Sequence, residues 1–123
     1  METASQTLGI LGEELAYHFV KRNGYKVLLK NYKCPLGEID LVAKEKGALI
    51  FMEVKTRSSL QMGLPAESVT FHKRTQLAKC AQYYLKRYRI VEVPCRFDVV
   101  SILMENGKEP RIEVIKDAFS EGE

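Results

Sequence analysis

Several features that define other protein classes are missing from this chain of 123 residues. No apolar run approaches the roughly 20 residues that a membrane-spanning helix requires. The N-terminus has no basic segment followed by a long apolar block, so the pattern of a secretory signal is absent. Repeats, linkers and low-complexity segments are missing too. We therefore expect a single domain over residues 1–123, located in the cytoplasm and not in a membrane.

Cysteine is scarce, with three residues and no CxxC pair. An odd number without paired spacing is typical of neither a zinc-thiolate site nor a disulfide scaffold. We interpret Cys34, Cys80 and Cys95 as reduced thiols, in agreement with a cytoplasmic location. A small apolar side chain is the ordinary role of such residues.

The net charge of +3 is small, but the charge is unevenly distributed. The segment from Lys55 to Arg89 has eight basic residues and one acidic residue, Glu67, so its balance is +7 and that of the remainder is −4. A basic segment attracts the phosphate backbone of a nucleic acid, although a solvated helix face is the alternative. The residues expected to contact nucleic acid are Arg57, Lys73, Arg74 and Lys79.

The most informative stretch is Leu36–Arg57, in which two apolar runs flank a short polar interruption. The runs are Ile39–Ala43 and Ala48–Val54, and Lys46-Gly47 lies between them. A glycine-bearing pair between β-rich runs predicts a hairpin with a two-residue loop. We expect this hairpin to form the centre of the sheet.

The predicted register gathers charge at the open end of the hairpin. It places Asp40 opposite Glu53 and Glu38 opposite Lys55. Side chains alternate between the faces of a strand, so these four residues share one face. The opposite face is apolar and comprises Ile39, Leu41, Ala43, Ile50, Met52 and Val54.

Two opposed carboxylates have Cβ atoms about 5 Å apart and repel each other, so their retention indicates a bound cation. Mg²⁺ and Mn²⁺ bind one or two carboxylates together with water and substrate phosphate. We expect Asp40 and Glu53 to bind the metal, with Glu38 as an additional ligand, and Lys55 to act on water or phosphate. The alternative is an exposed face with ion pairs such as Glu38–Lys55, which leaves Asp40 opposite Glu53 unexplained.

Two amphipathic helices are predicted on either side of the hairpin in the sequence. The first covers residues 5–23, and Gly9 and Gly12 within it suggest close packing on a sheet. Its apolar stripe comprises Leu8, Leu11, Leu15 and Phe19. The second begins at a cap on Thr70 and ends near Arg87. Its apolar stripe comprises Leu77, Cys80, Ala81, Tyr84 and Leu85.

Three further strands are predicted over Tyr25–Tyr32, Arg96–Leu103 and Arg111–Lys116. The resulting order, α-β-β-β-α-β-β, predicts an α/β fold with a mixed sheet of about five strands, whose apolar face is covered by the helices. The connection Ser58–Ala66 borders the polar end of the hairpin and either touches substrate or only links the elements.

Short motifs along the chain resemble a known family. Asp40 followed by Glu53-Val54-Lys55 resembles the D…(D/E)xK signature of restriction-endonuclease-like nucleases, and the ordered set resembles the YraN-type family of small bacterial proteins. The match runs from about Leu8 to Phe119 and is far more specific than D…ExK alone. Its pieces are Gly9-x-x-Gly12-Glu13-x-x-Ala16, Gly37-Glu38-Ile39-Asp40-Leu41, Phe51-Met52-Glu53-Val54-Lys55-x-Arg57, Lys73, Ala81-x-x-Tyr84-Leu85, Arg96-Phe97-Asp98-Val99-Val100 and Ala118-Phe119.

This resemblance implies a restriction-endonuclease-like core and Mg²⁺-dependent (or Mn²⁺-dependent) hydrolysis of DNA. It adds Glu13 to the expected catalytic residues Asp40, Glu53 and Lys55. Similarity to the Holliday-junction resolvases implies branched DNA as the substrate and leaves a homodimer open. The exonuclease branch pairs a glutamine with a tyrosine four residues later, whereas Gln76 is followed by Cys80, so that branch is disfavoured.

Two other functions remain open. One is a non-catalytic nucleic-acid-binding module, and the other is a structural protein whose acidic cluster is only ion-paired. An intact Asp40, Glu53 and Lys55 favours the enzyme, because a binding module has no need of the trio. The roles of His72 and Asp98 also stay open, with surface and structural roles as the alternatives to catalysis.

Overall fold

The computed structural model describes residues 4–58 and 70–120. Over these residues the order is α-β-β-β-α-β-β, as predicted. The connection predicted over Ser58–Ala66 lies outside the described residues from position 59 onward. The elements are α1 (Ala4–Arg22), β1 (Lys26–Cys34), β2 (Gly37–Glu45), β3 (Ala48–Arg57), α2 (Phe71–Arg87), β4 (Cys95–Leu103) and β5 (Arg111–Phe119).

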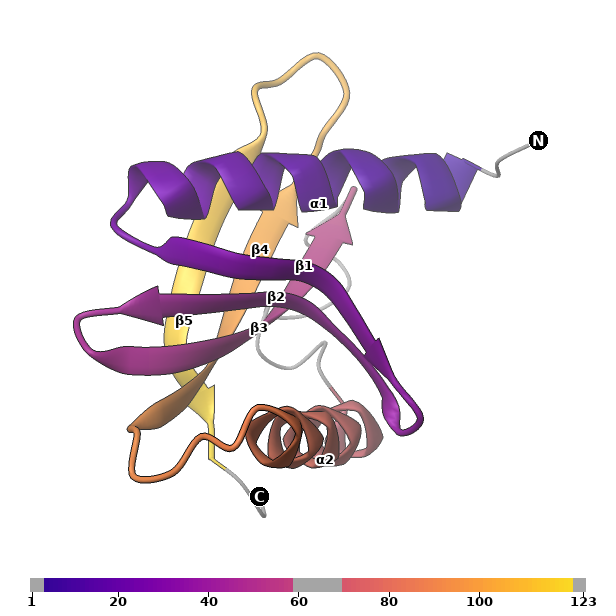
Figure 1. Ribbon diagram of the computed structural model, residues 1–123. Helices are drawn as coiled ribbons and strands as arrows, with labels where there is room; N and C mark the ends of the chain where they lie inside the picture. The colour runs from indigo at the N-terminus through magenta and orange to yellow at the C-terminus, as the bar shows by residue number, and fades with distance from the viewer. Residues whose placement is uncertain (1–3, 59–69, 121–123) are drawn as a thin grey trace.

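The described strands form one mixed sheet in the order β1-β2-β3-β4-β5 (Figure 1). Adjacent strands are antiparallel except β3 and β4, which run parallel. A parallel pair needs a crossover connection, and α2 belongs to the segment that joins β3 to β4. The predicted hairpin strand β3 is therefore the middle strand of the sheet.

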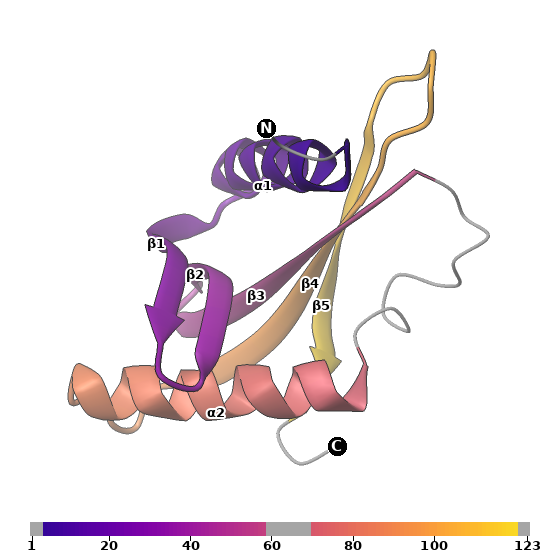
Figure 2. The ribbon, with the colours of Figure 1, turned by 90° about the vertical axis from the view of Figure 1, so that its right-hand side faces the viewer.

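The helices cover both faces of the sheet, rather than the single apolar face that the sequence predicted. α1 lies on one face and α2 on the other (Figure 2). Each face has its own apolar core, because Leu49, Ile50, Phe51 and Met52 of β3 are all buried in turn. Leu49 and Phe51 pack on the α2 side, whereas Ile50 and Met52 pack on the α1 side. A continuous apolar run is typical of a strand covered on both faces.

The hairpin between β2 and β3 has the predicted register. Lys46 and Gly47 both have positive φ, 49° and 85°, which is the conformation of a tight two-residue turn. The ladder extends from the pair Glu45–Ala48 to the pair Leu41–Met52. Asp40 and Glu53 lie one residue beyond its last described pair.

The face predicted for Ile39 is wrong, because Ile39 packs in the α2-side core whereas Leu41 packs on the α1 side. The β1–β2 ladder pairs Lys30 with Leu41 and Tyr32 with Ile39. Asn31, between these pairs, has a left-handed backbone with φ 51°. At this irregular position the side chains on both strands change from one face of the sheet to the other. The alternation of side chains between faces that the sequence predicted therefore fails between Ile39 and Leu41.

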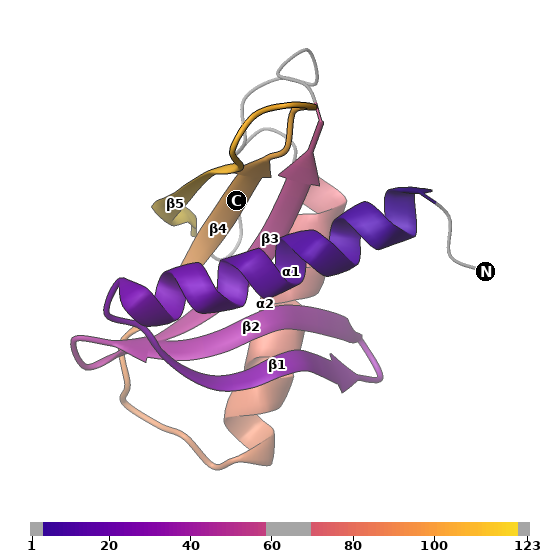
Figure 3. The ribbon, with the colours of Figure 1, turned by 90° about the horizontal axis from the view of Figure 1, so that it is seen from above.

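The buried face of α1 also differs from the prediction. Gly12, Ala16 and Val20 point to the sheet, whereas Leu11 of the predicted stripe is 52% exposed. A Cβ at Gly12 would overlap the side chain of Thr56 on β3, so the helix approaches the sheet over a glycine. Viewed from above, α1 crosses over β3 and β4 (Figure 3). Close packing is thus confirmed for Gly12 but not for Gly9, where an added Cβ would meet nothing within 4 Å.

The second helix follows its prediction closely. The hydroxyl of Thr70 accepts a hydrogen bond from the Lys73 amide at 3.2 Å and caps α2. Four members of the predicted apolar stripe are buried and the fifth, Leu85, packs against them. Among the described residues, no helix is both long and apolar enough to cross a membrane.

Candidate functional site

Asp40 lies where β2 separates from β3. Its Oδ2 accepts a hydrogen bond from the backbone amide of Val54 at 2.8 Å, and the residue is 8% exposed. Burial raises the pKa of Asp40; the Val54 hydrogen bond opposes that shift, and the charge of Glu38 adds to it. The carboxyl group is therefore held at a fixed point between the two strands.

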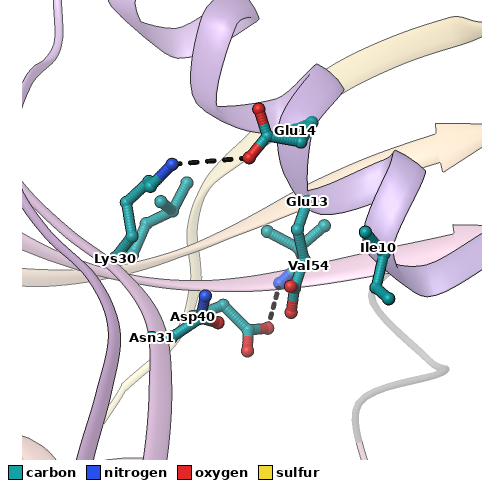
Figure 4. Close-up of a pocket in the computed structure, with 8 residues that line it drawn as sticks. Ile10, Glu13, Glu14, Lys30, Asn31, Asp40 and Val54 are labelled. Carbon is teal, nitrogen blue, oxygen red and sulfur yellow. Dashed lines mark hydrogen bonds and ion pairs between the residues drawn. The ribbon is translucent and has the colours of Figure 1, made fainter. Parts of the chain in front are cut away.

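Glu13 of α1 faces Asp40 across a cavity of about 210 Å³. Figure 4 shows the carboxyl group of Glu13 pointing toward that of Asp40, whereas Glu14 turns to Lys30 at 3.4 Å. Burial raises the pKa of Glu13, and the charges of Asp40 and Glu38 raise it further. Glu13 reaches the cavity because α1 turns Gly12 toward the sheet. The next residue of a helix is rotated by about 100°, so Glu13 lies at the margin of the buried face.

Glu53 of β3 is the most enclosed carboxyl group of the predicted site. It is 4% exposed, and its Oε1 lies 3.5 Å from Nζ of Lys73 on α2. Within the described part of the chain, its buried Oε2 has no hydrogen-bond partner. Burial raises the pKa of Glu53 to about 8, and the charge of Asp40 is the next cause. An unpaired buried carboxylate oxygen is costly, so this atom is suited to receive a cation or a proton.

Glu38 and Lys55 do not pair as predicted, because the described β2–β3 ladder ends at Leu41–Met52, before it reaches them. Their described partners lie on the other edges of the two strands, Lys33 of β1 for Glu38 and Ser101 of β4 for Lys55. Glu38 still belongs to the same electrostatic cluster, because its charge raises the pKa of both Asp40 and Glu13.

Lys55 lies on the same face of β3 as Glu53, because residues two apart in a strand share a face. It is half-buried, and its charge lowers the pKa of Glu53. Lys73, predicted to contact nucleic acid, instead reaches into the site through its ion pair with Glu53. Sequence reasoning missed this contact, although Lys73 at the start of α2 lies within a segment already identified as basic.

The other predicted nucleic-acid contacts are dispersed. Arg57 is only 4% exposed, so its side chain is inside the described structure and not on the surface as expected. Arg74 is half-buried, with its guanidinium 6.0 Å from the Phe119 ring. Lys79 is exposed, but six residues after Lys73 it points to another side of α2.

The donor set fits a hard divalent cation in part. Asp40 and Glu53 supply two buried carboxyl groups; the charge of Asp40 raises the pKa of Glu53, and the Oε2 of Glu53 lacks a partner among the described residues. Across residues 4–58 and 70–120, no group of three His, Cys, Asp or Glu side chains is arranged around one point. A cation that keeps water and substrate oxygens in its coordination shell needs only one or two carboxylates. Asp40 and Glu53 therefore suffice for Mg²⁺ or Mn²⁺.

Comparison with known sequences identifies the family of the chain. Residues 12–102 match the sequence model of the family described as "Uncharacterised protein family UPF0102". The chain belongs to this family. The match confirms the YraN-type resemblance, and its range contains Glu13, Asp40, Glu53 and Lys55.

Members of UPF0102 from several bacteria are similar to the chain over nearly its whole length. A UPF0102 protein of Caldicellulosiruptor saccharolyticus is 43% identical over 113 residues, covering 91% of this chain and 96% of the relative. One of Trichlorobacter lovleyi is 42% identical, covering 94% and 91%. Another, of Legionella pneumophila strain Paris, is 40% identical, covering 96% and 98%.

Asp98, a residue of the UPF0102 motifs with an open role, belongs to a buried structural network. It is fully buried on β4, which is an internal strand of the sheet. Its carboxyl group accepts hydrogen bonds from the Tyr25 hydroxyl at 2.9 Å, from Arg96 Nε at 2.8 Å and from the Asp117 amide at 2.9 Å. These bonds tie β4 to β5 and to Tyr25, which directly precedes β1, and this is a structural role. His72 is exposed in the first turn of α2.

Proposed function

We propose that this chain is a Mg²⁺- or Mn²⁺-dependent endonuclease that hydrolyses phosphodiester bonds in DNA, within the cytoplasm. The observation that carries the proposal is a pair of neighbouring buried carboxyl groups, toward one of which a third carboxyl group points from α1. Asp40 of β2 and Glu53 of β3 are buried next to each other, and Glu13 of α1 points at Asp40. The resemblance to the D…ExK nucleases and their restriction-endonuclease-like core supports the same function.

Asp40 and Glu53 are the residues that would hold the cation, with Glu38 and Glu13 contributing negative charge around it. A bound divalent cation lowers the pKa of a water ligand and stabilises charge on a phosphoryl oxygen. The Val54 amide keeps Asp40 oriented. Such pre-organisation of the protein groups is what an in-line displacement at phosphorus requires.

Lys55 and Lys73 supply positive charge on the same face of β3 as Glu53. Lys55 positions the attacking water or neutralises a phosphoryl oxygen. Lys73 is paired with Glu53 in the structure and becomes available to a DNA phosphate once Glu53 binds another cation. Lys79, which is exposed on another side of α2, adds positive charge to that helix but does not line the site. Branched DNA is the preferred substrate by analogy with the Holliday-junction resolvases, and two sites of a homodimer would suit its symmetry.

The direct test is incubation of the purified chain with linear, single-stranded, flap and four-way DNA, with and without Mg²⁺ or Mn²⁺. We expect cleavage that needs the metal and is strongest on the four-way substrate. Lys55→Ala should bind metal and DNA and lose cleavage by at least a hundredfold, because positioning of water is used in the transition state. Lys108→Ala, at an exposed lysine of the β4–β5 turn, is the matched control and should cleave normally.

A non-catalytic nucleic-acid-binding module is the second candidate. The observation that favours it is the Lys73–Glu53 ion pair, which already neutralises part of the acidic cluster. For this function, DNA binding would persist in the absence of metal, no substrate would be cut, and Lys55→Ala would behave as the parent. Cleavage lost specifically in Lys55→Ala would decide for the enzyme.

A further inference from the structure

Two of the three cysteines meet between β1 and α2. Cys80 is fully buried in the α2-side core, and Cys34, at the end of β1, packs against that core. Cys34 is also close enough to act on Cys80, because its thiol raises the pKa of Cys80. Both are free in the structure. The sequence gives no indication of this contact, because the residues are far apart along the chain and belong to no spaced motif.

A second contact, next to the two thiols, holds the β1–β2 turn against α2. Cys34 pairs with Gly37 across the β1–β2 turn. Gly37 lies against Gln76 of α2 so closely that an added Cβ would come within 2.6 Å of Nε2. Gln76 and Cys80 are four residues apart and therefore share one face of the helix. Figure 2 shows the β1–β2 turn reaching α2.

We propose that Cys34 and Cys80 form a redox modification site, at which hydrogen peroxide converts the two thiols into a disulfide that ties the β1–β2 turn to α2. This inference does not rest on the proposed nuclease function. It concerns a covalent state of the fold that is reversible by thiol reductants. Disulfide formation needs side chains that already approach each other, which the two adjoining contacts provide.

The unequal burial of the two thiols sets the order of the reaction. Cys34 is half-buried, whereas Cys80 has no exposed surface. Burial, together with the neighbouring Cys34 thiol, raises the pKa of Cys80 to about 12, so Cys80 stays protonated at neutral pH. Cys34 is therefore the sulfur that a dissolved oxidant reaches first.

The chemistry balances in two steps. The sulfur of Cys34 attacks one oxygen of hydrogen peroxide; the O–O bond breaks, an S–O bond forms, and the released hydroxide leaves as water with the thiol proton. The sulfur of Cys80 then attacks that of Cys34; the S–S bond forms, the S–O bond breaks, and a second water leaves with the proton of Cys80. The two thiols lose two electrons in total, and the peroxide gains them.

The experiment uses the full chain with Cys95→Ser, because the exposed Cys95 would otherwise form bonds between molecules. After treatment with hydrogen peroxide, intact mass should show the loss of two hydrogens. Peptide mapping without reductant should join the peptides that contain Cys34 and Cys80. The melting temperature should rise by roughly 10 °C, since the new bond closes a long loop, and should return on reduction.

Two further variants, in the same Cys95→Ser background, are the controls. Cys34→Ser and Cys80→Ala should each abolish the mass change and the thermal shift, and Cys34→Ser removes the partly exposed thiol without changing the buried one. Three results would overturn the proposal. They are free thiols after treatment, oxidation of Cys34 to sulfinic acid without a cross-link, and a cross-link that leaves the melting temperature unchanged.

Discussion

The backbone amide of Val54 donates a hydrogen bond to Oδ2 of Asp40 at 2.8 Å, one step beyond the last described pair of the β2–β3 ladder. The side chain of Asp40 therefore provides a link between β2 and β3 beyond the last described backbone pair. Because β2 turns away at this point, the space beside Asp40 opens toward α1 and admits the carboxyl group of Glu13 (Figure 4). The site exists where the hairpin stops being regular.

Replacing the two glycines of α1 should have opposite effects on stability. Gly12→Ala should destabilise the chain by about 1–3 kcal/mol, because the new methyl group overlaps Thr56 and forces α1 away from β3. Gly9→Ala, with open space around the added Cβ, should be neutral or stabilising by up to about 1 kcal/mol. Chemical denaturation of the two variants measures both values. Equal effects would show that α1 does not pack on β3 as described.

The β2–β3 register was predictable because its determinants are local. Lys46-Gly47 selects a two-residue turn, and that turn fixes every pair down to Leu41–Met52. The same is true of α2, whose capping residue Thr70 and apolar stripe are continuous in sequence. The convergence of Asp40 and Glu53 followed from this register and needed no tertiary information.

The features that the sequence did not predict depend on contacts between segments that are distant along the chain. The burial of Gly12 in place of Leu11 results from a close approach to Thr56, which periodicity does not encode. Similarly, the change of face at Ile39 accompanies a left-handed backbone at Asn31 on the neighbouring strand. Arg57 is predicted to contact nucleic acid because it belongs to the basic segment, whereas the assembled fold buries its side chain.

The stability of the metal-free protein should fall as the pH rises through the pKa of Glu53. This pKa is raised from 4.5 to about 8, so the folded state keeps a proton that the unfolded state has lost. The stabilisation is therefore complete below about pH 4.5 and is lost as pH increases toward about 8, with a slope of at most about 1.4 kcal/mol per pH unit. Urea denaturation at pH 6 and pH 9 tests this. Glu53→Gln should flatten the dependence, and a parent protein more stable at pH 9 would contradict it.

Removal of the Lys73 ammonium group should weaken DNA binding at every sequence. Each phosphate that a protein neutralises contributes roughly −0.9 to the slope of log K against log salt concentration, so Lys73→Ala should make that slope shallower by about that amount. Lys108→Ala, far from α2 on the β4–β5 turn, is the control (Figure 1). The measurement is a filter-binding titration at several salt concentrations. Identical slopes for the parent and Lys73→Ala would remove Lys73 from the DNA-binding surface.

The central claim is that Asp40 and Glu53 together hold a divalent cation. Asp40→Asn removes one negative charge but keeps an oxygen that accepts the Val54 hydrogen bond, so it should stabilise the metal-free protein by about 1 kcal/mol. The parent should gain about 2.7 kcal/mol when Mg²⁺ or Mn²⁺ is added at ~100 times its dissociation constant, because the cation binds the folded state. The variant should gain almost none of this.

The most direct measurement is a thermal melt of the parent and Asp40→Asn at fixed ionic strength, with and without Mg²⁺ or Mn²⁺. The predicted result is a rise in melting temperature of the parent that largely disappears in the variant. A parent without any metal-dependent shift, together with an Asp40→Asn variant less stable than the parent, would contradict the account and make the carboxyl groups an ordinary structural network.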